Sequence, residues 1–293
     1  MIIVCLIGGL GNQMFQYATA RAVAYRTNMP LKLDVTAFAN YKLRPYRLGC
    51  FNIIEDFATE TEVRRFRRPR RRQIIAFTTY EIKKHLLPWR GPKFVEEQGL
   101  SFDPGILRID ESAYLIGYWQ SEKYFADVAE LIRQEFTLKS EPDKLNEQVL
   151  DEIEVANSVS LHIRRGDYIS NPVTNKVHGV LGLDYYSRAV NYVASRTAQP
   201  HFFIFSDDIA WAKENLRLSF PLSFIEHNGK GREYEDLRLM SRCKHHIIAN
   251  SSFSWWGAWL NANPEKIVVS PEKWFNDPSL ESKDLIPEYW VKM

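Results

Sequence analysis

The stretch HFFIFSDDIAWAKENL, residues 201–216, decides the fold class of this chain. An apolar run ends at Ser206, and a helical pattern begins at Asp208. Alternation of this kind continues on both sides, with strands expected at 159–164, 201–206, 222–227, 245–250 and 266–270 and helices at 184–196, 208–216, 233–243 and 252–262. Regular alternation predicts a parallel sheet with helices on both faces.

A second α/β unit is expected at the amino-terminal end. The apolar strand MIIVCLI is followed by the glycine turn GGLGNQ, a helix from Asn12 to about Arg26 and the strand LKLDV. AYLIGYW at 113–119 adds a strand, residues 121–136 a helix capped by Ser121, and 41–104 reads as irregular and basic. At ~100 to 200 residues per domain, 293 residues favour two domains, which we expect at 1–150 and 151–293.

The amino-acid composition limits the classes of protein to which this chain can belong. The chain is 45% hydrophobic and 25% charged, as globular proteins are. No apolar run reaches the ~20 residues that span a bilayer, and the first residues lack a basic leader and cleavage site, so we expect a cytoplasmic protein. Cys5, Cys50 and Cys243 are far apart in the sequence, which favours neither a zinc site nor a disulfide framework.

A run of arginines, RRFRRPRRR, extends from Arg64 to Arg72. It fits either a solvated surface segment or peripheral contact with anionic lipid on the inner membrane face. Nucleic-acid binding is disfavoured, because the charge is not spread over a face with interleaved aromatic residues. A non-enzymatic basic module that binds membrane or RNA stays open as an alternative, although it leaves the motifs below without a role.

Ligands of parallel α/β sheets bind beyond the carboxyl ends of the strands. HIRRGDY, residues 162–168, places two arginines at such an end. A guanidinium binds phosphate oxygens through two hydrogen bonds and stays charged, so Arg164 or Arg165 suits a pyrophosphate. The structural alternative is an internal ion pair between an arginine and Asp167.

Two further strand ends carry polar residues. In FSDD, residues 205–208, Ser206 or Asp207 either caps the next helix or hydrogen-bonds a nucleotide base or ribose. The chain contains no Asp-x-Asp, so we predict no metal there.

In NSSFSWWGAW, residues 250–259, the amides of the first helical turn and three serines form a candidate anion site. The three tryptophans of this stretch are assigned to the core, and His245 and His246 before it are assigned to a structural role and not to a metal site.

The glycine turn at 8–13 does not identify a ligand by itself. The dinucleotide fingerprint requires a third glycine where this chain has Met14, and the phosphate-loop pattern requires a Lys-Ser/Thr that is missing. Asp34 imitates the ribose-binding acid of that fingerprint and keeps a nicotinamide-dependent oxidoreductase as an alternative. A tight strand-to-helix turn is the structural explanation.

The motifs GGLGNQMFQYA, GYWQSEKYF, HIRRGDY, FSDD and NSSFSWWGAWL, in this order, resemble the bacterial α-1,2-fucosyltransferases of glycosyltransferase family 11. The resemblance covers nearly the whole chain. It implies a GT-B-like α/β fold of two Rossmann-type domains whose parallel sheets face a cleft. GDP-fucose is expected in the carboxy-terminal half, and the acceptor sugar mainly in the amino-terminal half.

The resemblance also implies roles for individual residues. Arg164 would bind the β-phosphate, His162 and Asp167 would shape the same pocket, and Asn12 would lie across the cleft near the transferred sugar. The expected donor-binding set is Gly11, Gln13, Arg165, Ser206, Asp207, Asn250, Ser251, Ser252, Phe253 and Ser254. Our mechanistic hypothesis is an inverting single displacement without metal or cofactor, with Asp34 or Asp167 as the candidate general base.

Overall fold

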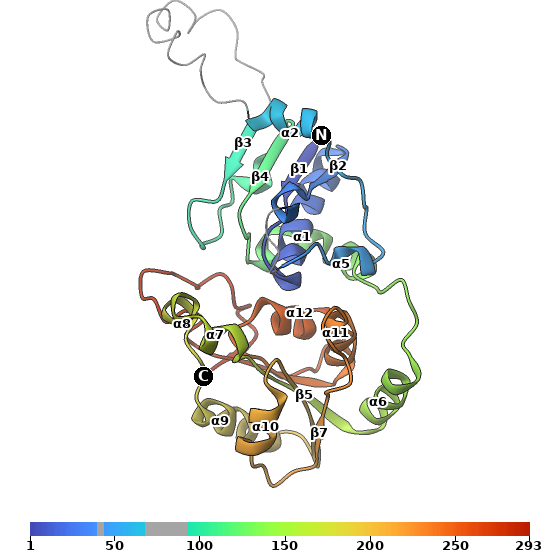
Figure 1. The fold of residues 1–293 in the computed structure, drawn as a ribbon, viewed down its shortest axis with the longest axis vertical. Coiled ribbons are helices and arrows are strands. Elements are labelled where there is room, and N and C mark those ends of the chain that lie inside the picture. Colours follow the sequence, from blue (N-terminus) through green and yellow to red (C-terminus); the bar gives the residue numbers. More distant parts are fainter. Residues whose placement is uncertain (40–43, 68–92) are drawn as a thin grey trace, which may run out of the picture.

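The computed structural model describes residues 1–39, 44–67 and 93–293, which form two parallel sheets (Figure 1). The first sheet has the order β2-β1-β4-β3 and the second the order β10-β9-β8-β5-β6-β7. The strands are β1 (Ile2–Cys5), β2 (Leu31–Asp34), β3 (Lys93–Glu96), β4 (Ala113–Ile116), β5 (Asn157–Ile163), β6 (Pro200–Ser206), β7 (Leu222–Phe224), β8 (His245–Ile247), β9 (Val268–Ser270) and β10 (Val291–Lys292). The expected parallel α/β fold is confirmed.

Helices connect the strands in both halves. The amino-terminal half contains α1 (Leu10–Thr27), α2 (Glu60–Arg67) and α5 (Ala129–Glu135). The carboxy-terminal half contains α6 (Lys144–Val155), α7 (Gly166–Ser170), α8 (Pro172–His178), α9 (Leu183–Ala194), α10 (Ile209–Asn215), α11 (Glu233–Arg242) and α12 (Ser252–Leu260). Parallel strands need crossover connections of this kind, which are usually helical.

The amino-terminal half corrects two of our sequence predictions. The segment 41–104 is not wholly irregular, because it contributes α2 and the edge strand β3. A continuous helix over 121–136 is also wrong: two short 3₁₀ turns precede α5. Ser121 does act as a cap, since its hydroxyl accepts a hydrogen bond from the Lys123 amide. Of the arginine run, residues 68–72 lie outside the described part of the chain.

The linking helix α6 belongs with the second sheet. It begins at the Asp143 cap, whose carboxylate accepts from the Asn146 amide, and it packs on α11 and β5. The helix therefore spans the division at residue 150 that we expected between the domains. That division stays a prediction.

One hydrophobic cluster contains buried residues from both halves, because α1 packs against α12 at the junction (Figure 1). The Phe15 ring lies 4.5 Å from the Trp255 ring and 4.9 Å from the Trp256 ring, and Phe125 stacks on Trp256 at 5.4 Å. Trp255, Trp256 and Trp259 are almost fully buried, which confirms the prediction that they are core residues. The two halves therefore share a core.

The two histidines have hydrogen-bond partners within the fold, as expected of a structural role. His246 is fully buried, with one ring nitrogen 2.8 Å from the Ser160 hydroxyl and the other 2.8 Å from the Asn261 amide nitrogen. His245 accepts a hydrogen bond from the Ile267 amide. All three cysteines are free thiols.

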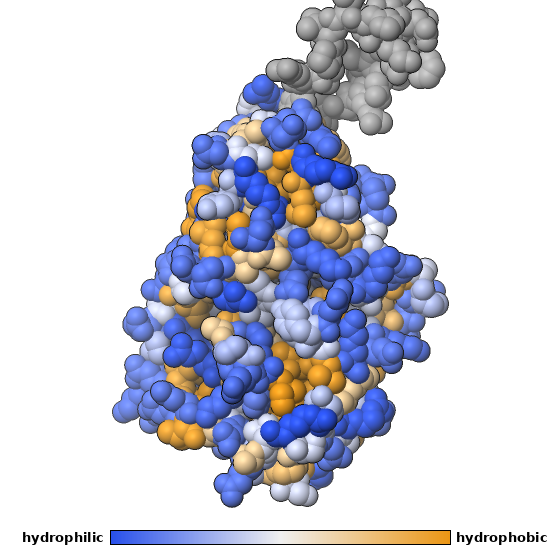
Figure 2. Space-filling view, turned by 180° about the vertical axis from the view of Figure 1, so that it is seen from behind, coloured by the Kyte–Doolittle hydropathy of each residue, from blue (hydrophilic) through white to orange (hydrophobic). Residues whose placement is uncertain are grey.

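Hydrophilic residues cover most of the rear face, where apolar residues form separate patches (Figure 2). Within the described ranges, none of the helices combines the length and the apolar character that crossing a membrane requires.

We expect Trp256→Ala to lower the free energy of unfolding by about 3–5 kcal/mol, the usual cost of truncating a buried aromatic side chain. Because the core is shared, wild type and variant should each unfold in one urea transition. Tyr25→Ala, which removes an exposed ring from α1, is the control and should change stability by about 0.5 kcal/mol or less. Two separate transitions, only one of them shifted by Trp256→Ala, would contradict a shared core.

Candidate functional site

Two arginines and two aspartates meet at the carboxyl ends of β5 and β6. Ile163 pairs with Ser206 in the last step of the parallel register, so the next residues leave the sheet side by side. Arg164 forms an ion pair with Asp207 at 3.0 Å, and the Asp207 carboxylate also accepts the Arg165 amide at 2.8 Å. The side chains of Arg164 and Asp207 are about one fifth exposed. We refer to Arg164, Arg165, Asp207 and Asp208 as the Arg–Asp cluster.

Arg165 has a different environment from Arg164. Its guanidinium carbon lies 3.6 Å from the centre of the Trp211 ring, and its Nε is 3.6 Å from the Asp208 carboxylate. The carboxylate of Asp208, not Ser206 or Asp207, caps α10 by accepting the Trp211 amide, so our predicted cap was wrong by one or two residues. Ser206 instead accepts the Asp208 amide at 3.0 Å. Arg165 is thus held against α10, whereas Arg164 lies over Tyr168, 5.4 Å from the ring centre.

His162 lies directly behind the Arg–Asp cluster and is 4% exposed. Burial, opposed by Asp207 and reinforced by Arg164, lowers the pKa of His162 to about 4, so the ring is neutral at pH 7. The Phe253 ring is 5.9 Å from it. The His162 Nδ1 atom has no hydrogen-bond partner among the residues that the structure describes. The ring therefore adds no charge to the cluster.

The first turns of α1 and α12 lie against each other. Their contacts advance in the same order along both helices: Gly11 and Asn12 touch Ser252, and Phe15 touches Trp255 and Trp256. A Cβ at position 11 would be 2.5 Å from the Ser252 carbonyl carbon, so only glycine fits here. The Trp256 indole donates to the Gly11 carbonyl at 3.0 Å. We call these two first turns the paired helix starts.

The paired helix starts bring two positive dipole ends together. Neither Gly9 nor Ser251 caps its helix through a side chain, and neither first turn contains an acidic residue. Free amides of this kind form an anion site. The α12 start is also close to the Arg–Asp cluster, because Phe253 contacts His162 and the Tyr168 hydroxyl donates to the Asn250 carbonyl at 2.9 Å.

Asn12 and Gln13 fasten the segments around the α1 start. The Asn12 amide oxygen accepts from the Ser252 hydroxyl at 2.7 Å and from the Gln120 amide at 2.8 Å, which joins three chain segments. Gln13 is fully buried; its amide donates to the Gly8 and Pro45 carbonyls and accepts the Arg47 amide. Gln13 therefore holds the loop around Pro45, and its predicted ligand contact stays a prediction.

The turn before α12 is also held by its own polar groups. Asn250 is 1% exposed, and its amide donates to the carbonyls of His178 and Trp274. Ser254 is buried and donates to the Ser251 carbonyl at 3.3 Å. Among the predicted serines, Ser252 is the one whose hydroxyl bridges to the other half, through Asn12.

Of the two candidate general bases, the structure describes the side chain of Asp34 but not that of Asp167. Asp34 is fully buried, and its carboxylate accepts from the Tyr114 hydroxyl at 2.6 Å and from the Thr36 amide and hydroxyl. A substrate cannot reach this carboxylate, so Asp34 was wrong as a candidate base. For the same reason Asp34 cannot contact the ribose of a nicotinamide cofactor. Asp167 lies on α7, and its side chain is outside what the structure describes.

Sequence reasoning missed three residues that shape the cluster. Trp211 covers Arg165, and Tyr168 links Arg164 to the turn before α12. A Cβ at Gly166 would be 2.6 Å from the Asp207 carboxylate, so glycine leaves room for that carboxylate. The sequence did contain a signal for Trp211, because it lies three residues after Asp208 and therefore one helical turn from a residue that can cap a helix. Within the described ranges, His, Cys, Asp and Glu form no group of three that could hold a metal ion.

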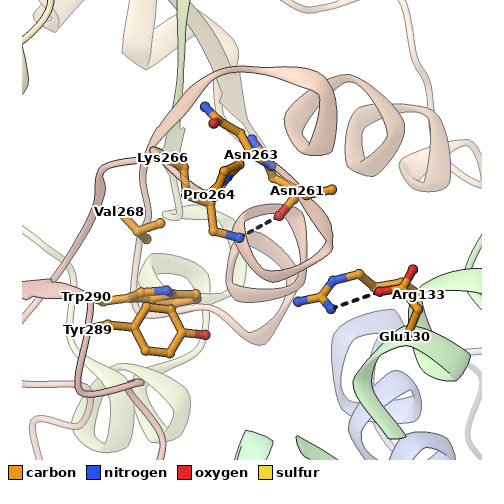
Figure 3. Close-up of a pocket in the computed structure, with 10 residues that line it drawn as sticks. Glu130, Arg133, Asn261, Asn263, Pro264, Lys266, Val268, Tyr289 and Trp290 are labelled. Atoms are coloured by element: carbon orange, nitrogen blue, oxygen red, sulfur yellow. Dashed lines mark hydrogen bonds and ion pairs between the residues drawn. The ribbon is translucent and has the colours of Figure 1, made fainter.

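A separate pocket of about 300 Å³ lies at the other end of α12 (Figure 3). The Lys266 ammonium in it donates to the carbonyls of Ala258 and Asn261, which balances the negative end of that helix. Burial and the neighbouring Arg133 lower the pKa of Lys266 to about 8. Since α12 is about 13 Å long at 1.5 Å per residue, this pocket is remote from the paired helix starts.

Comparison with known proteins shows which family this sequence resembles. The model of glycosyl transferase family 11 matches residues 1–293. An alpha-1,2-colitosyltransferase of Escherichia coli is 38% identical, with 100% of this chain and 99% of its own length aligned. The O-antigen biosynthesis glycosyltransferase WbnK of Escherichia coli is 39% identical over 92% of this chain and 94% of its own length.

A more distant relative and a solved structure extend the comparison. Galactoside alpha-(1,2)-fucosyltransferase 2 of Pongo pygmaeus is 28% identical over 87% of this chain and 67% of its own length. The crystal structure of NodZ alpha-1,6-fucosyltransferase soaked with GDP-fucose matches with a TM-score of 0.50 over 88% of this chain and 92% of its own, at 15% identity. The two-domain GT-B architecture that we expected is confirmed.

We expect His162 to make the protein less stable in mild acid. The unfolded chain binds a proton at this histidine near pH 6.5, whereas the folded protein binds it near pH 4, so stability falls as the pH drops between these values. From pH 7 to pH 5 the loss is about 2 kcal/mol. His162→Phe should remove that part of the loss in urea unfolding at the two pH values. An equal loss in variant and wild type would show that His162 takes up its proton over the same pH range in the folded and the unfolded chain.

Proposed function

The chain belongs to glycosyl transferase family 11, and from this premise we propose that it is an inverting transferase of L-fucose from GDP-fucose to the 2-hydroxyl of a galactosyl acceptor. The observation that carries the proposal is the meeting of the Arg–Asp cluster with the paired helix starts. The arginines of the cluster and the amides of the helix starts supply fixed hydrogen-bond donors where the two halves join. A departing pyrophosphate is the anion that such a site suits.

Arg164 is the arginine proposed to bind the donor phosphate. It is one fifth exposed and held by Asp207, whereas Arg165 stacks on Trp211. In the proposed step, the acceptor hydroxyl oxygen attacks the anomeric carbon, the bond to the β-phosphate oxygen breaks, and GDP leaves with that electron pair. Attack from the opposite face converts the β-linked donor into an α-linked product. The acceptor proton passes to a base or to solvent.

We further propose that the reaction needs no divalent metal or cofactor. Asp207 and Asp208 are the carboxylates that a cation would use, but each is already paired with an arginine. A cation at this place would have to displace Arg164 from Asp207 and lie beside a second guanidinium. Charge on the leaving group is instead neutralised by arginine and by helix amides that are in place before the reaction.

A second donor is favoured by a specific observation. The chain aligns over its whole length with an alpha-1,2-colitosyltransferase. Colitose is fucose without the 3-hydroxyl group, so a GDP-linked colitose would fit the same phosphate and guanosine contacts. The two donors differ only at a hydroxyl, and a site that hydrogen-bonds it rejects the deoxy sugar by about 10⁴-fold or more.

The proposal is tested by a transfer assay with GDP-fucose and GDP-colitose on lactose and other β-galactosides, after EDTA treatment and dialysis. We expect fucose transfer at an unchanged rate without metal, and an α-1,2 linkage by NMR. Higher kcat/KM for GDP-colitose would favour the second donor. Full loss of activity in EDTA with recovery on Mg²⁺ or Mn²⁺ would make Asp207 and Asp208 metal ligands, and stabilisation by NAD but not GDP would refute the proposal.

Arg164→Lys should lower kcat/KM for the sugar nucleotide by about 100-fold or more, because lysine keeps the charge but loses the two-pronged phosphate geometry. The melting temperature should stay close to that of wild type. Arg188→Lys is the matched control, since Arg188 forms an exposed ion pair with Asp184 on α9. Near-native kcat/KM in a well-folded Arg164→Lys variant would show that Arg164 is not the phosphate ligand.

A further inference from the structure

The turn at residues 117–120 follows β4 at the carboxyl edge of the first sheet and contacts the paired helix starts. The Gln120 amide donates to Asn12, which also accepts from Ser252. The turn is therefore joined, through one side chain, to the start of α12 in the other half. Of the turn's aromatic residues, Trp119 is 1% exposed, but the Tyr118 ring is 38% exposed.

The backbone of this turn is strained. Trp119 has φ of +54°, a left-handed conformation that is rare for a bulky residue and costs about 1–3 kcal/mol. Such strain persists only where the surroundings hold it in place, and it is concentrated at ligand-binding and catalytic sites. The Gln16 amide fixes the start of the turn by donating to the Gly117 carbonyl at 3.0 Å.

Glu97 holds the strained conformation. One carboxylate oxygen accepts the Tyr118 amide at 2.6 Å and the other accepts the Trp119 amide at 2.9 Å. Gly117 makes room for it, because a Cβ there would lie 2.4 Å from the Glu97 Cβ. Burial raises the pKa of Glu97, because it disfavours the charged form of the carboxylate. Glu97 is therefore not a solvated surface charge.

We propose that this turn is the acceptor platform of the site, on which the Tyr118 ring stacks against the apolar face of the acceptor's sugar ring. Glu97 is its positioning residue. A partly exposed aromatic ring offers a sugar a flat apolar surface. The inference rests on the proposed function, and it places the acceptor on the amino-terminal side of the paired helix starts.

The first test is Tyr118→Ala. We expect the KM for lactose to rise about 10- to 100-fold, as for loss of a central contact residue. The rate at which GDP-fucose is hydrolysed without acceptor, and the melting shift caused by GDP, should not change. Tyr118→Phe should keep the KM within about threefold. Tyr25→Ala is the matched control, since Tyr25 is 59% exposed near the other end of α1.

The second test is Glu97→Gln, which replaces one accepting oxygen with a donor that faces a backbone N–H. We expect a rise in the KM for lactose that resembles that of Tyr118→Ala, again with unchanged donor hydrolysis. If this variant changes only the melting temperature, Glu97 has a structural role alone and its positioning role is refuted.

Failure of this inference can be told apart from failure of the proposed function. If wild type transfers fucose to lactose and Tyr118→Ala keeps its KM, the acceptor platform is wrong and the proposed function stands. If wild type neither binds GDP nor uses a sugar nucleotide, both are overturned. If it hydrolyses GDP-fucose but uses no β-galactoside, the galactosyl acceptor and the platform proposed for it are both rejected.

Discussion

The backbone contact between α1 at Gly11 and α12 at Ser252 is the constraint on which the rest of the structure depends. No side chain larger than hydrogen fits at position 11. Because the helices meet there, Phe15 packs on Trp255 and Trp256, and one hydrophobic core forms from two sheets. A small residue at the contact thus allows large aromatic residues to pack around it.

The same contact places two uncapped helix starts next to each other, which favours the binding of an anion there. Two uncapped helix starts side by side repel each other, since each carries about half a positive charge. The aromatic core behind them holds this arrangement, and an anion bound at the two helix starts would relieve the repulsion. The GDP-fucose that we propose as substrate carries such an anion, so packing and ligand binding are coupled at one place.

The arginines are held in position before any ligand binds. Parallel pairing of β5 with β6 places Arg164 next to Asp207, and α10 places Trp211 and Asp208 around Arg165. A long side chain that is already ordered loses less entropy when it binds phosphate. His162, neutral because it is buried, adds a polar nitrogen at the same strand without adding charge.

Local sequence patterns were enough to predict the α/β alternation, the positions of Arg164 and Asp207 at strand ends and of Ser252 at a helix start, and the burial of the three tryptophans, because strand and helix periodicities are local. The same patterns misplaced the α10 cap, missed the strand β3 and proposed the enclosed Asp34 as a base. Packing of distant segments encloses Asp34 between Tyr114 and Thr36, lets Glu97 hold the turn at 117–120, and brings the starts of α1 and α12 together. These are contacts between residues up to about 240 positions apart, and such contacts depend on how the helices pack, which local sequence patterns do not record.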